Sequence, residues 1–249
     1  MVKDDKLYVS EIFKSIDGEG FHAGQVTVFV RLFGCNLRCV WCDTLTTWTE
    51  EQHEKIYGRK PIWMTVDEIV AKVEDLEQGW PYKSICLTGG EPLMEENKEL
   101  VTELIDRLIE LNYAINIETN GAVDYKYWTE SFGRPWFVDL YGNRTGVSLI
   151  TDWKLPSSRM NHRMIQSNLK ILRECDLIKC VISDDPEDWT AFEEQVCKSG
   201  TKAKIYLSPC FGKVTMSKIP QFVVAHPEYN ITAQIQLHKS FYPPETVGV

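Results

Sequence analysis

The chain has 249 residues, of which 43% are hydrophobic and 25% are charged, and its formal net charge is −9. These proportions are typical of a globular protein, and no run of about 18 apolar residues could cross a bilayer. The negative charge disfavours direct binding to a nucleic-acid backbone, which needs clustered Lys and Arg. The amino terminus lacks the apolar core of a signal peptide, so we expect a cytoplasmic protein.

Short apolar or alternating runs recur along the chain and predict strands. They are 26–32, 84–87, 114–117, 147–150, 177–182, 204–207 and 230–237. Between them lie helical patterns. Thr65 and Glu68 have the spacing of a capping box, which predicts a helix start at Thr65. An apolar stripe over 100–111 predicts a second helix, and Pro186 opens a third, over 189–198.

Alternating strands and helices predict an α/β fold with a mostly parallel sheet. Two segments, 48–63 and 124–143, show no clear period and are interpreted as insertions into this repeat. No low-complexity linker divides the chain, so we predict a single domain over residues 1–249.

Polar residues follow successive strands at the point where each strand ends. Cys35 follows the first strand, Gly90 the second, Glu118 the third and Asp152 the fourth, and Ser208 follows a later one. The carboxyl ends of parallel strands share one face, where ligand sites are built. We therefore expect these residues to converge on one site.

Cys35, Cys39 and Cys42 have the spacing C-x3-C-x2-C. Thiolates at such short spacings hold iron–sulfur clusters, and three of them leave the fourth iron open to another ligand. The alternative is a zinc site, for which the nearest fourth ligand is His53. The other cysteines are scattered, and we interpret them as small buried hydrophobes; they are Cys86, Cys175, Cys180, Cys197 and Cys210.

Together with Gly-Gly-Glu-Pro at 89–92 and Glu-Thr-Asn-Gly at 118–121, the cysteine motif resembles the radical S-adenosylmethionine (SAM) superfamily. The resemblance implies an incomplete parallel β/α barrel. It also implies a four-iron four-sulfur (4Fe-4S) cluster whose open iron binds SAM. The cluster and SAM would supply the radical chemistry, and the protein would place them and exclude water.

Within this superfamily, residues 11–20, 31–37 and 42–44 resemble the 7-carboxy-7-deazaguanine synthase family, and the similarity extends to 236–239. The resemblance implies conversion of 6-carboxy-5,6,7,8-tetrahydropterin to 7-carboxy-7-deazaguanine with release of ammonia, in queuosine biosynthesis. It further implies Mg²⁺ as a cofactor, a flavodoxin or ferredoxin as electron donor, and a homodimer. The stretch 11–20 would be a substrate-binding segment ahead of the radical SAM core, and it argues against the alternative of a glycyl-radical-enzyme activase. A non-catalytic zinc-binding module is the alternative outside enzymes.

The resemblance also implies individual roles for site residues. The substrate-binding candidates are Ile16, Asp17, Gly18, Arg31, Thr88 and Glu118. A guanidinium matches a carboxylate with paired donors, so Arg31 would bind the carboxylate of the pterin. The alternatives are an ion pair for Arg31 and a turn residue for Asp17.

Thr44 would place its hydroxyl oxygen on Mg²⁺; without the resemblance we interpret it as an ordinary turn residue. The SAM-binding candidates are Trp41, Gly90, Asp152, Trp153, Lys154 and Ser208. Two glycines would let the backbone approach the methionine part of SAM closely. For Trp41, packing beneath the cysteine loop is the alternative. No catalytic side chain is expected beyond the cluster and SAM.

Overall fold

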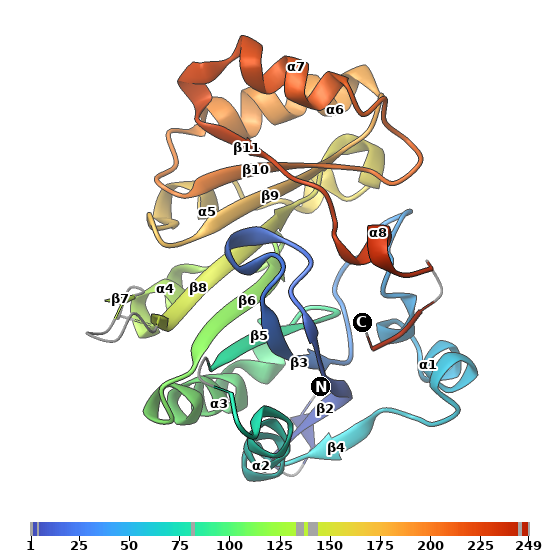
Figure 1. Cartoon of the computed structure of the whole chain (residues 1–249), viewed down its shortest axis with the longest axis vertical. Helices are drawn as coiled ribbons and strands as arrows, with labels where there is room; N and C mark the ends of the chain where they lie inside the picture. Colours follow the sequence, from blue (N-terminus) through green and yellow to red (C-terminus); the bar gives the residue numbers. More distant parts are fainter. Residues whose placement is uncertain are drawn as a thin grey trace.

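The computed structural model describes residues 2–3, 5–80, 83–132, 137–138, 144–243 and 246–248. Figure 1 labels its elements. The strands are β1 (Val2–Lys3), β2 (Lys6–Ile16), β3 (Val26–Leu32), β4 (Ile62–Met64), β5 (Ser84–Gly89), β6 (Ala114–Asn120), β7 (Phe137–Val138), β8 (Arg144–Trp153), β9 (Leu177–Ile182), β10 (Lys204–Pro209) and β11 (Ile231–Ala233). The helices are α1 (Glu50–Tyr57), α2 (Val66–Glu77), α3 (Lys98–Glu110), α4 (Lys126–Ser131), α5 (Asn168–Ile171), α6 (Pro186–Ala191), α7 (Lys218–Ala225) and α8 (His238–Phe241). Within the described ranges, none of these helices combines the length and apolar character that a bilayer crossing needs.

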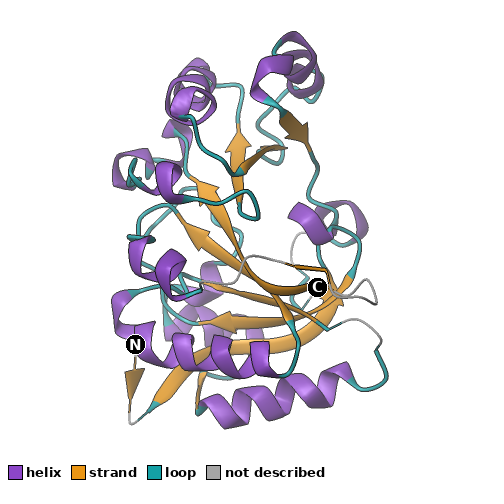
Figure 2. Ribbon diagram, turned by 90° about the vertical axis from the view of Figure 1, so that its left-hand side faces the viewer, coloured by secondary structure: helices purple, strands orange, loops and turns teal. Residues whose placement is uncertain are grey.

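One curved sheet organises the chain, in the order β1-β2-β3-β5-β6-β8-β9-β10-β11. From β3 to β11, each strand runs parallel to its neighbour on this path, whereas β2 is antiparallel to β3. Helices cover the outer side of the sheet (Figure 2). Among the described residues, no pairing joins β11 to β2, so the sheet stays open. The predicted α/β fold and incomplete barrel are confirmed.

The two faces of the sheet differ in polarity because side chains alternate along each strand. The outward residues form the apolar core against the helices; they include Val28, Val30, Ile85, Leu87, Ile115, Ile117, Val147 and Leu149. Many inward residues of the strands are polar and also buried; they include Thr27, Ser84, Asn116, Ser148 and Lys179, beside the apolar Phe29, Cys86 and Ile150. The barrel interior is thus more polar than the outer core.

The loop of residues 17–25, between β2 and β3, spans the gap that the strands leave open. The backbone N–H of Gly20 donates to Gln234 Oε1 over 2.9 Å, and the N–H of Leu237 donates to Gly18 O over 3.0 Å. Figure 1 shows this loop beside the strands and the carboxyl-terminal segment. This loop and the carboxyl-terminal tail, which is the chain from Gln234 onward, together therefore close the barrel without strand pairing.

The predicted capping box is present, because Thr65 Oγ1 accepts from the Glu68 N–H over 3.2 Å and Glu68 Oε2 accepts from the Thr65 N–H over 2.8 Å. The stripe over 100–111 is confirmed as the buried face of α3. The third predicted helix, over 189–198, is α6 followed by a π-helical turn, Phe192–Val196, and a short 3-10 turn.

One sequence-based prediction of local structure, the strand 230–237, is wrong in its length, and one segment holds more regular structure than its pattern indicates. The segment 48–63, interpreted as an insertion without a clear period, contains α1 and β4. The sequence of α1 has no apolar period, because His53 is the single buried residue of this helix. The predicted strand 230–237 ends at Ala233; from Gln234 the chain leaves the sheet towards the loop 17–25. In the other segment, 124–143, residues 133–136 and 139–143 lie outside the described residues.

Candidate active site

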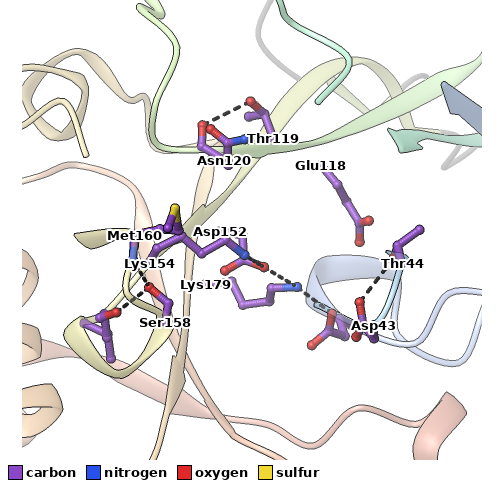
Figure 3. A network of polar contacts seen from close by, with 12 residues as sticks. Asp43, Thr44, Glu118, Thr119, Asn120, Asp152, Lys154, Ser158, Met160 and Lys179 are labelled. Carbon is purple, nitrogen blue, oxygen red and sulfur yellow. Dashed lines mark hydrogen bonds and ion pairs between the residues drawn. The ribbon is translucent and has the colours of Figure 1, made fainter. Parts of the chain in front are cut away.

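Polar side chains from neighbouring strands meet at the carboxyl-terminal end of the sheet, on its inner face (Figure 3). Arg31 on β3 lies opposite Thr88 on β5. Asp152 on β8 lies between Asn120 on β6 and Lys179 on β9. Parallel register therefore brings together residues that lie far apart in sequence, as the sequence predicted.

The cysteine loop, residues 34–43, begins directly after β3. Gly34 has φ of +101°, a left-handed conformation that favours glycine at the exit from the strand. Cys39 is buried, whereas Cys35 and Cys42 are partly exposed. In the described part of the chain, no three His, Cys, Asp or Glu side chains are arranged closely enough to hold a metal ion. The three thiols thus share one loop without forming a closed ligand set.

The surroundings of the thiols nevertheless fit an iron–sulfur cluster. The N–H of Leu37 donates to Cys35 Sγ over 3.4 Å, a contact of the kind that stabilises cluster sulfurs. Burial raises the pKa of Cys42 to about 11, and the positive charge of Lys154 opposes that rise. The thiols form no disulfide, so all three are available to a metal.

The turn after β5 is built against the cysteine loop. Gly90 N–H donates to Leu32 O over 3.1 Å, and Glu91 N–H donates to Gly34 O over 2.8 Å. A Cβ atom on Gly90 would lie 1.9 Å from Gly34 O and 2.8 Å from Cys35 Cβ. Only glycine therefore permits this approach, which agrees with a close passage of backbone beside a ligand.

Glu91 anchors the same turn to β6. Its carboxylate accepts from the N–H groups of Leu93 and Asn120, over 2.9 and 2.6 Å, and from Thr119 Oγ1 over 2.7 Å. Burial raises its pKa to about 7, and these hydrogen bonds oppose the rise. Glu91 therefore holds the glycine turn in place, a role that the motif alone did not assign.

A buried network of charges occupies the inner face. Lys179 Nζ lies 2.6 Å from Glu19 Oε2 and 3.3 Å from Asp152 Oδ2, and Lys154 Nζ lies 2.9 Å from the same Asp152 oxygen. Two buried oxygens, Glu19 Oε1 and Asp152 Oδ1, accept no hydrogen bond from any described residue. Buried acceptors normally have donors, so these oxygens are suited to the N–H or O–H groups of a ligand.

Two of the predicted SAM-binding residues have fully buried side chains that already contact other residues of the chain. The Trp153 ring is fully buried in the core, where its Nε1 donates to Gln195 Oε1 over 3.3 Å. Strand alternation places it opposite to its neighbours Asp152 and Lys154. Ser208 is also fully buried, and its Oγ accepts from Gln234 Nε2 over 2.9 Å. The Trp153 side chain therefore packs in the core and the Ser208 hydroxyl holds Gln234, so the SAM contacts predicted for these two residues would use backbone atoms.

Residues 16–18 enter the site at the end of β2. The Asp17 carboxylate is buried and accepts from the N–H of Glu19 over 3.2 Å, which is the turn contact that the sequence left open as an alternative. Burial, and then the negative charge of Glu118, raise the pKa of Asp17 to about 7. A Cβ on Gly18 would lie 2.4 Å from His238 Nδ1. The carboxyl-terminal tail therefore packs directly on this segment.

Three further substrate candidates line the adjoining strands. Thr88 Oγ1 donates to Glu118 Oε2 over 2.7 Å, so these two residues are in contact. Arg31 Nε donates to Glu11 Oε1 over 2.8 Å, and the Arg31 side chain is 17% exposed. The ion-pair alternative for Arg31 is thus present, but as a largely buried pair across β2 and β3 rather than as a surface contact.

Thr44 and Trp41 lie at the end of the cysteine loop. Thr44 Oγ1 donates to Asp43 Oδ1 over 3.2 Å, and Asp43 Oδ2 pairs with Lys239 Nζ over 3.0 Å. The Asp43 side chain is 56% exposed, and the positive charge of Lys239 holds its pKa well below the ordinary range. Trp41 is partly exposed, with Lys213 Nζ 6.0 Å from its ring centroid. Its ring therefore has an accessible face.

His53, the fourth ligand of the zinc alternative, lies elsewhere. Its Nε2 is 3.1 Å from Ser10 Oγ, and its Nδ1 is 2.7 Å from Arg59 O. It is a buried histidine with polar partners in its own part of the fold. The structure therefore gives the zinc alternative no support.

Sequence reasoning missed several residues of the site. Lys179 is the single charged residue of β9, an otherwise apolar strand, and this contrast was the available signal. Glu19 lies inside the matched segment 11–20. Gln234 gave no local signal, because its importance arises from contacts with residues more than 20 positions away.

Comparisons with known proteins agree with this geometry. Residues 30–131 match the radical SAM superfamily model. A 7-carboxy-7-deazaguanine synthase from Clostridium acetobutylicum is 35% identical over 243 residues, covering 97% of this chain and 98% of that protein. One from Thermoplasma acidophilum is 30% identical and covers 95% of this chain and 97% of its own. The crystal structure of QueE from Escherichia coli superposes with a TM-score of 0.66 at 20% identity, covering 92% of this chain and 94% of that one, which shows the shared fold.

Proposed function

Because the chain belongs to the 7-carboxy-7-deazaguanine synthase family of radical SAM enzymes, we propose that it converts 6-carboxy-5,6,7,8-tetrahydropterin to 7-carboxy-7-deazaguanine with release of ammonia. The reaction belongs to 7-deazapurine biosynthesis, as in the route to queuosine. Near-complete coverage at 35% identity is the observation that carries the proposal, because it includes the substrate segment as well as the radical SAM core.

Membership in the radical SAM superfamily implies a 4Fe-4S cluster and SAM. Cys35, Cys39 and Cys42 would hold the cluster, which with SAM supplies a substrate-activating radical when bound. The Gly90 turn would receive the methionine part of SAM against the cysteine loop. Asp152, with its free buried oxygen, supplies an acceptor for SAM donors.

We propose that the pterin binds on the other side of the inner face. The bond between Arg31 and Glu11 uses Nε, so the terminal guanidinium nitrogens are the groups that can face a carboxylate. With its pKa near 7, Asp17 holds a proton in part of the molecules at neutral pH and can then donate a hydrogen bond to a pterin acceptor. Glu118 accepts from Thr88 and can accept from substrate amino groups as well. These side chains bind and orient; the chemistry belongs to the cofactors.

We also propose Mg²⁺ at Thr44, a metal that takes oxygen ligands and commonly shares its site with substrate. The neighbouring Asp43 carboxylate fits this assignment, because it is held ionised beside the Thr44 hydroxyl. If metal and substrate share the site, each tightens the other by the same factor.

Calorimetric titration of the pterin, with and without Mg²⁺, tests this link. Removing Mg²⁺ is expected to weaken pterin binding and to leave SAM binding nearly intact. Thr44→Ala is expected to mimic chelation, whereas Thr44→Ser, which keeps the oxygen, is expected to be much milder. Equal pterin affinity in all of these cases would make Thr44 a turn residue only.

The remaining proposals concern partners and location. A flavodoxin or ferredoxin would deliver the electron, since radical SAM chemistry requires one reducing equivalent per cleavage. The resemblance of residues 11–20 and 31–37 to the family supports a homodimer. The described cysteines form no disulfide, which fits a reducing compartment and supports a cytoplasmic location. A glycyl-radical activase is disfavoured, because full-length relatives carry the synthase name.

Mass spectrometry of the reconstituted enzyme with the carboxytetrahydropterin, SAM and dithionite tests the function. We expect a product that has lost ammonia and contains the contracted deazapurine ring. Cleavage of SAM without any change in the pterin would assign the chain to a different radical SAM reaction.

A further inference from the structure

The side-chain amide of Asn120 lies between the end of β6 and the cysteine loop. Asn120 is 6% exposed, and its Nδ2 donates to Asn36 Oδ1 over 2.8 Å and lies 4.0 Å from Cys35 Sγ. A primary amide has two N–H donors, so one can serve each partner. Both donors of Asn120 are therefore directed at the loop that carries the three cysteines.

The oxygen of the same amide fixes its orientation. Asn120 Oδ1 accepts from the N–H of Ala122 over 2.9 Å. If the amide were flipped, this bond would be lost and an oxygen would face Asn36 Oδ1. The nitrogen of Asn120 must consequently face Asn36 and Cys35.

Asn36 completes a reciprocal contact between the cysteine loop and the turn after β6. Its Oδ1 accepts from Asn120, while its Nδ2 donates to Ala122 O over 3.3 Å. We call the side chains of Asn36 and Asn120 the amide clamp. The amide clamp joins the turn at 120–122 to the residue that directly follows Cys35.

The β6 side of the amide clamp is held by further hydrogen bonds. The main-chain N–H of Asn120 donates to Glu91 Oε2 over 2.6 Å, and its carbonyl accepts from the hydroxyl of the fully buried Tyr125 over 2.7 Å. Gly121 O accepts from Asn168 Nδ2 over 3.3 Å. The amide of Asn120 is therefore placed before any cofactor binds, as a preorganised site requires.

The sulfur of Cys35 has a second donor nearby, the N–H of Leu37 at 3.4 Å. Hydrogen bonds to the sulfurs of an iron–sulfur cluster are among the factors that set its reduction potential. Reduction adds negative charge to the cluster and its thiolates, so a donor at Cys35 Sγ favours the reduced form. Loss of such a donor lowers the potential.

Resting on the cluster of the proposed function, we propose that Asn120 is a positioning residue for that cluster. Its amide holds the cysteine loop through Asn36 and donates a hydrogen bond to Cys35 Sγ, which makes the cluster easier to reduce. This role concerns the cluster alone and needs neither SAM nor the pterin.

Two substitutions at Asn120 separate its hydrogen bonds from its charge. Asn120→Leu has a similar shape and removes the donors without adding charge. Asn120→Asp keeps the acceptor for the Ala122 N–H but sets a carboxylate against Asn36 Oδ1 and Cys35 Sγ. Asn112→Asp is the matched control, since Asn112 is exposed just before β6, at the opposite end of that strand from Asn120.

The reduction potential of the reconstituted enzyme tests the bond to Cys35. It is titrated anaerobically without SAM or pterin and followed by electron paramagnetic resonance. For Asn120→Leu, we expect the equilibrium constant for one-electron reduction of the cluster to fall by about tenfold, which is a shift of about 59 mV to more negative potential. Asn120→Asp is expected to shift the potential further in the same direction, and Asn112→Asp is expected to leave it unchanged.

Hydrogen exchange of the full chain before reconstitution tests the amide clamp without a cluster. We expect faster exchange at the Leu37 amide in both Asn120 variants, because Asn36 loses its partner and the cysteine loop opens more often. Exchange in Asn112→Asp is expected to match that of the unaltered protein. This measurement also decides the case in which a variant assembles no cluster.

An unchanged potential in Asn120→Leu would overturn the proposal, and so would a shift confined to Asn120→Asp, which the added charge alone would explain. Unchanged exchange at Leu37 in both variants would overturn the holding role of the amide clamp. A shifted potential in an enzyme that makes no deazapurine would refute the proposed function and leave this proposal standing. Deazapurine formation with unchanged potentials would do the reverse.

Discussion

Charged side chains on the inner face depend on one another for their ionisation. Burial of Asp152 disfavours its charged form, but Lys154 and Lys179 lower its pKa below the ordinary value. Glu19 contributes a second negative charge to this network, because its carboxylate pairs with Lys179. Removing one member of a buried charged group leaves another uncompensated, at a cost of about 3–5 kcal/mol. The network is therefore expected to hold its geometry before any ligand arrives.

At the cysteine loop, Cys35→Ala, Cys39→Ala and Cys42→Ala are each expected to abolish cluster assembly and SAM cleavage. Each change removes one of three protein ligands. Cys86→Ala is the control, because this thiol is fully buried on β5, away from the loop. Iron content and 5′-deoxyadenosine formation are the measurements. Full iron content in any of the three variants would remove that cysteine from the ligand set.

The raised pKa of Asp17 predicts that the stability of the fold depends on pH. Its pKa is raised from 3.8 to about 7 in the fold. Between these values the folded state holds more protons than the unfolded state, so the free energy of unfolding falls as pH rises from about 4 to about 7, and the contribution is constant outside this window. The groups that face Asp17 are Glu118 and Glu19, which raise its pKa by their negative charge, and Lys179, which lowers it.

Asp17→Asn keeps an acceptor for the Glu19 N–H and removes the titration. We expect denaturant unfolding of the variant to show a smaller loss of stability between pH 4 and 7 than the unaltered protein shows. The buried Glu91 also has a raised pKa, so part of the slope is expected to persist. Identical slopes in the two proteins would mean that Asp17 stays ionised throughout.

At the scale of elements, each βα turn on the ligand face is shaped by its neighbour. The Gly89-Gly90 turn after β5 lies against the exit from β3, and Glu91 ties it to the end of β6. A Cβ on Gly89 would lie 2.2 Å from Leu32 O, and Gly89 has φ of +144°. Both glycines are therefore required by backbone packing alone.

Gly90→Ala is expected to push the cysteine loop away, because its Cβ would overlap Gly34 O. Overpacking of this kind costs about 1–3 kcal/mol, and we expect a lower midpoint of denaturation together with reduced iron incorporation. Gly58→Ala is the control: it makes the same exchange where a Cβ meets nothing within 4 Å, although Gly58 has φ of +67°. Normal iron incorporation in Gly90→Ala would show that the cysteine loop can shift while its three cysteines still bind the cluster.

At the scale of the whole molecule, the barrel is closed by loop and tail rather than by strands. Gln234 is the link, because its side chain accepts from Gly20 N–H and donates to Ser208 Oγ. The same tail pairs Lys239 with Asp43 at the end of the cysteine loop. The loop 17–25, the last strands and the cysteine loop are thus held in one arrangement by the carboxyl-terminal residues.

Gln234→Ala is expected to loosen the loop 17–25 without unfolding the sheet. Hydrogen exchange at the Gly20 amide should accelerate, because its acceptor is lost, and the KM for the pterin should rise more than kcat falls. Gln221→Ala, an exposed position on α7, is the control. Unchanged exchange at Gly20 would show that other contacts of the loop, such as the Gly18–Leu237 bond, suffice to hold it.

The sequence by itself determined the α/β alternation, the parallel sheet and the candidate cofactor residues. These are local signals: strand and helix periods, a capping box, and cysteine and glycine motifs whose spacing is set within one loop. It failed for α1, since a helix that buries one histidine has no apolar period. The direction of the Trp153 side chain was not predicted, because it depends on which face of β8 turns towards the helices.

Tertiary structure alone decided that Lys179 and Glu19 join the predicted Asp152 in the site. Lys179, Glu19 and Asp152 come from three parts of the chain and meet because register sets β8 beside β9 and the loop 17–25 folds over both. Gln234 joins Gly20 to Ser208 in the same way. No local pattern encodes such contacts, because their stability comes from burying paired polar groups that only the closed barrel brings within bonding distance.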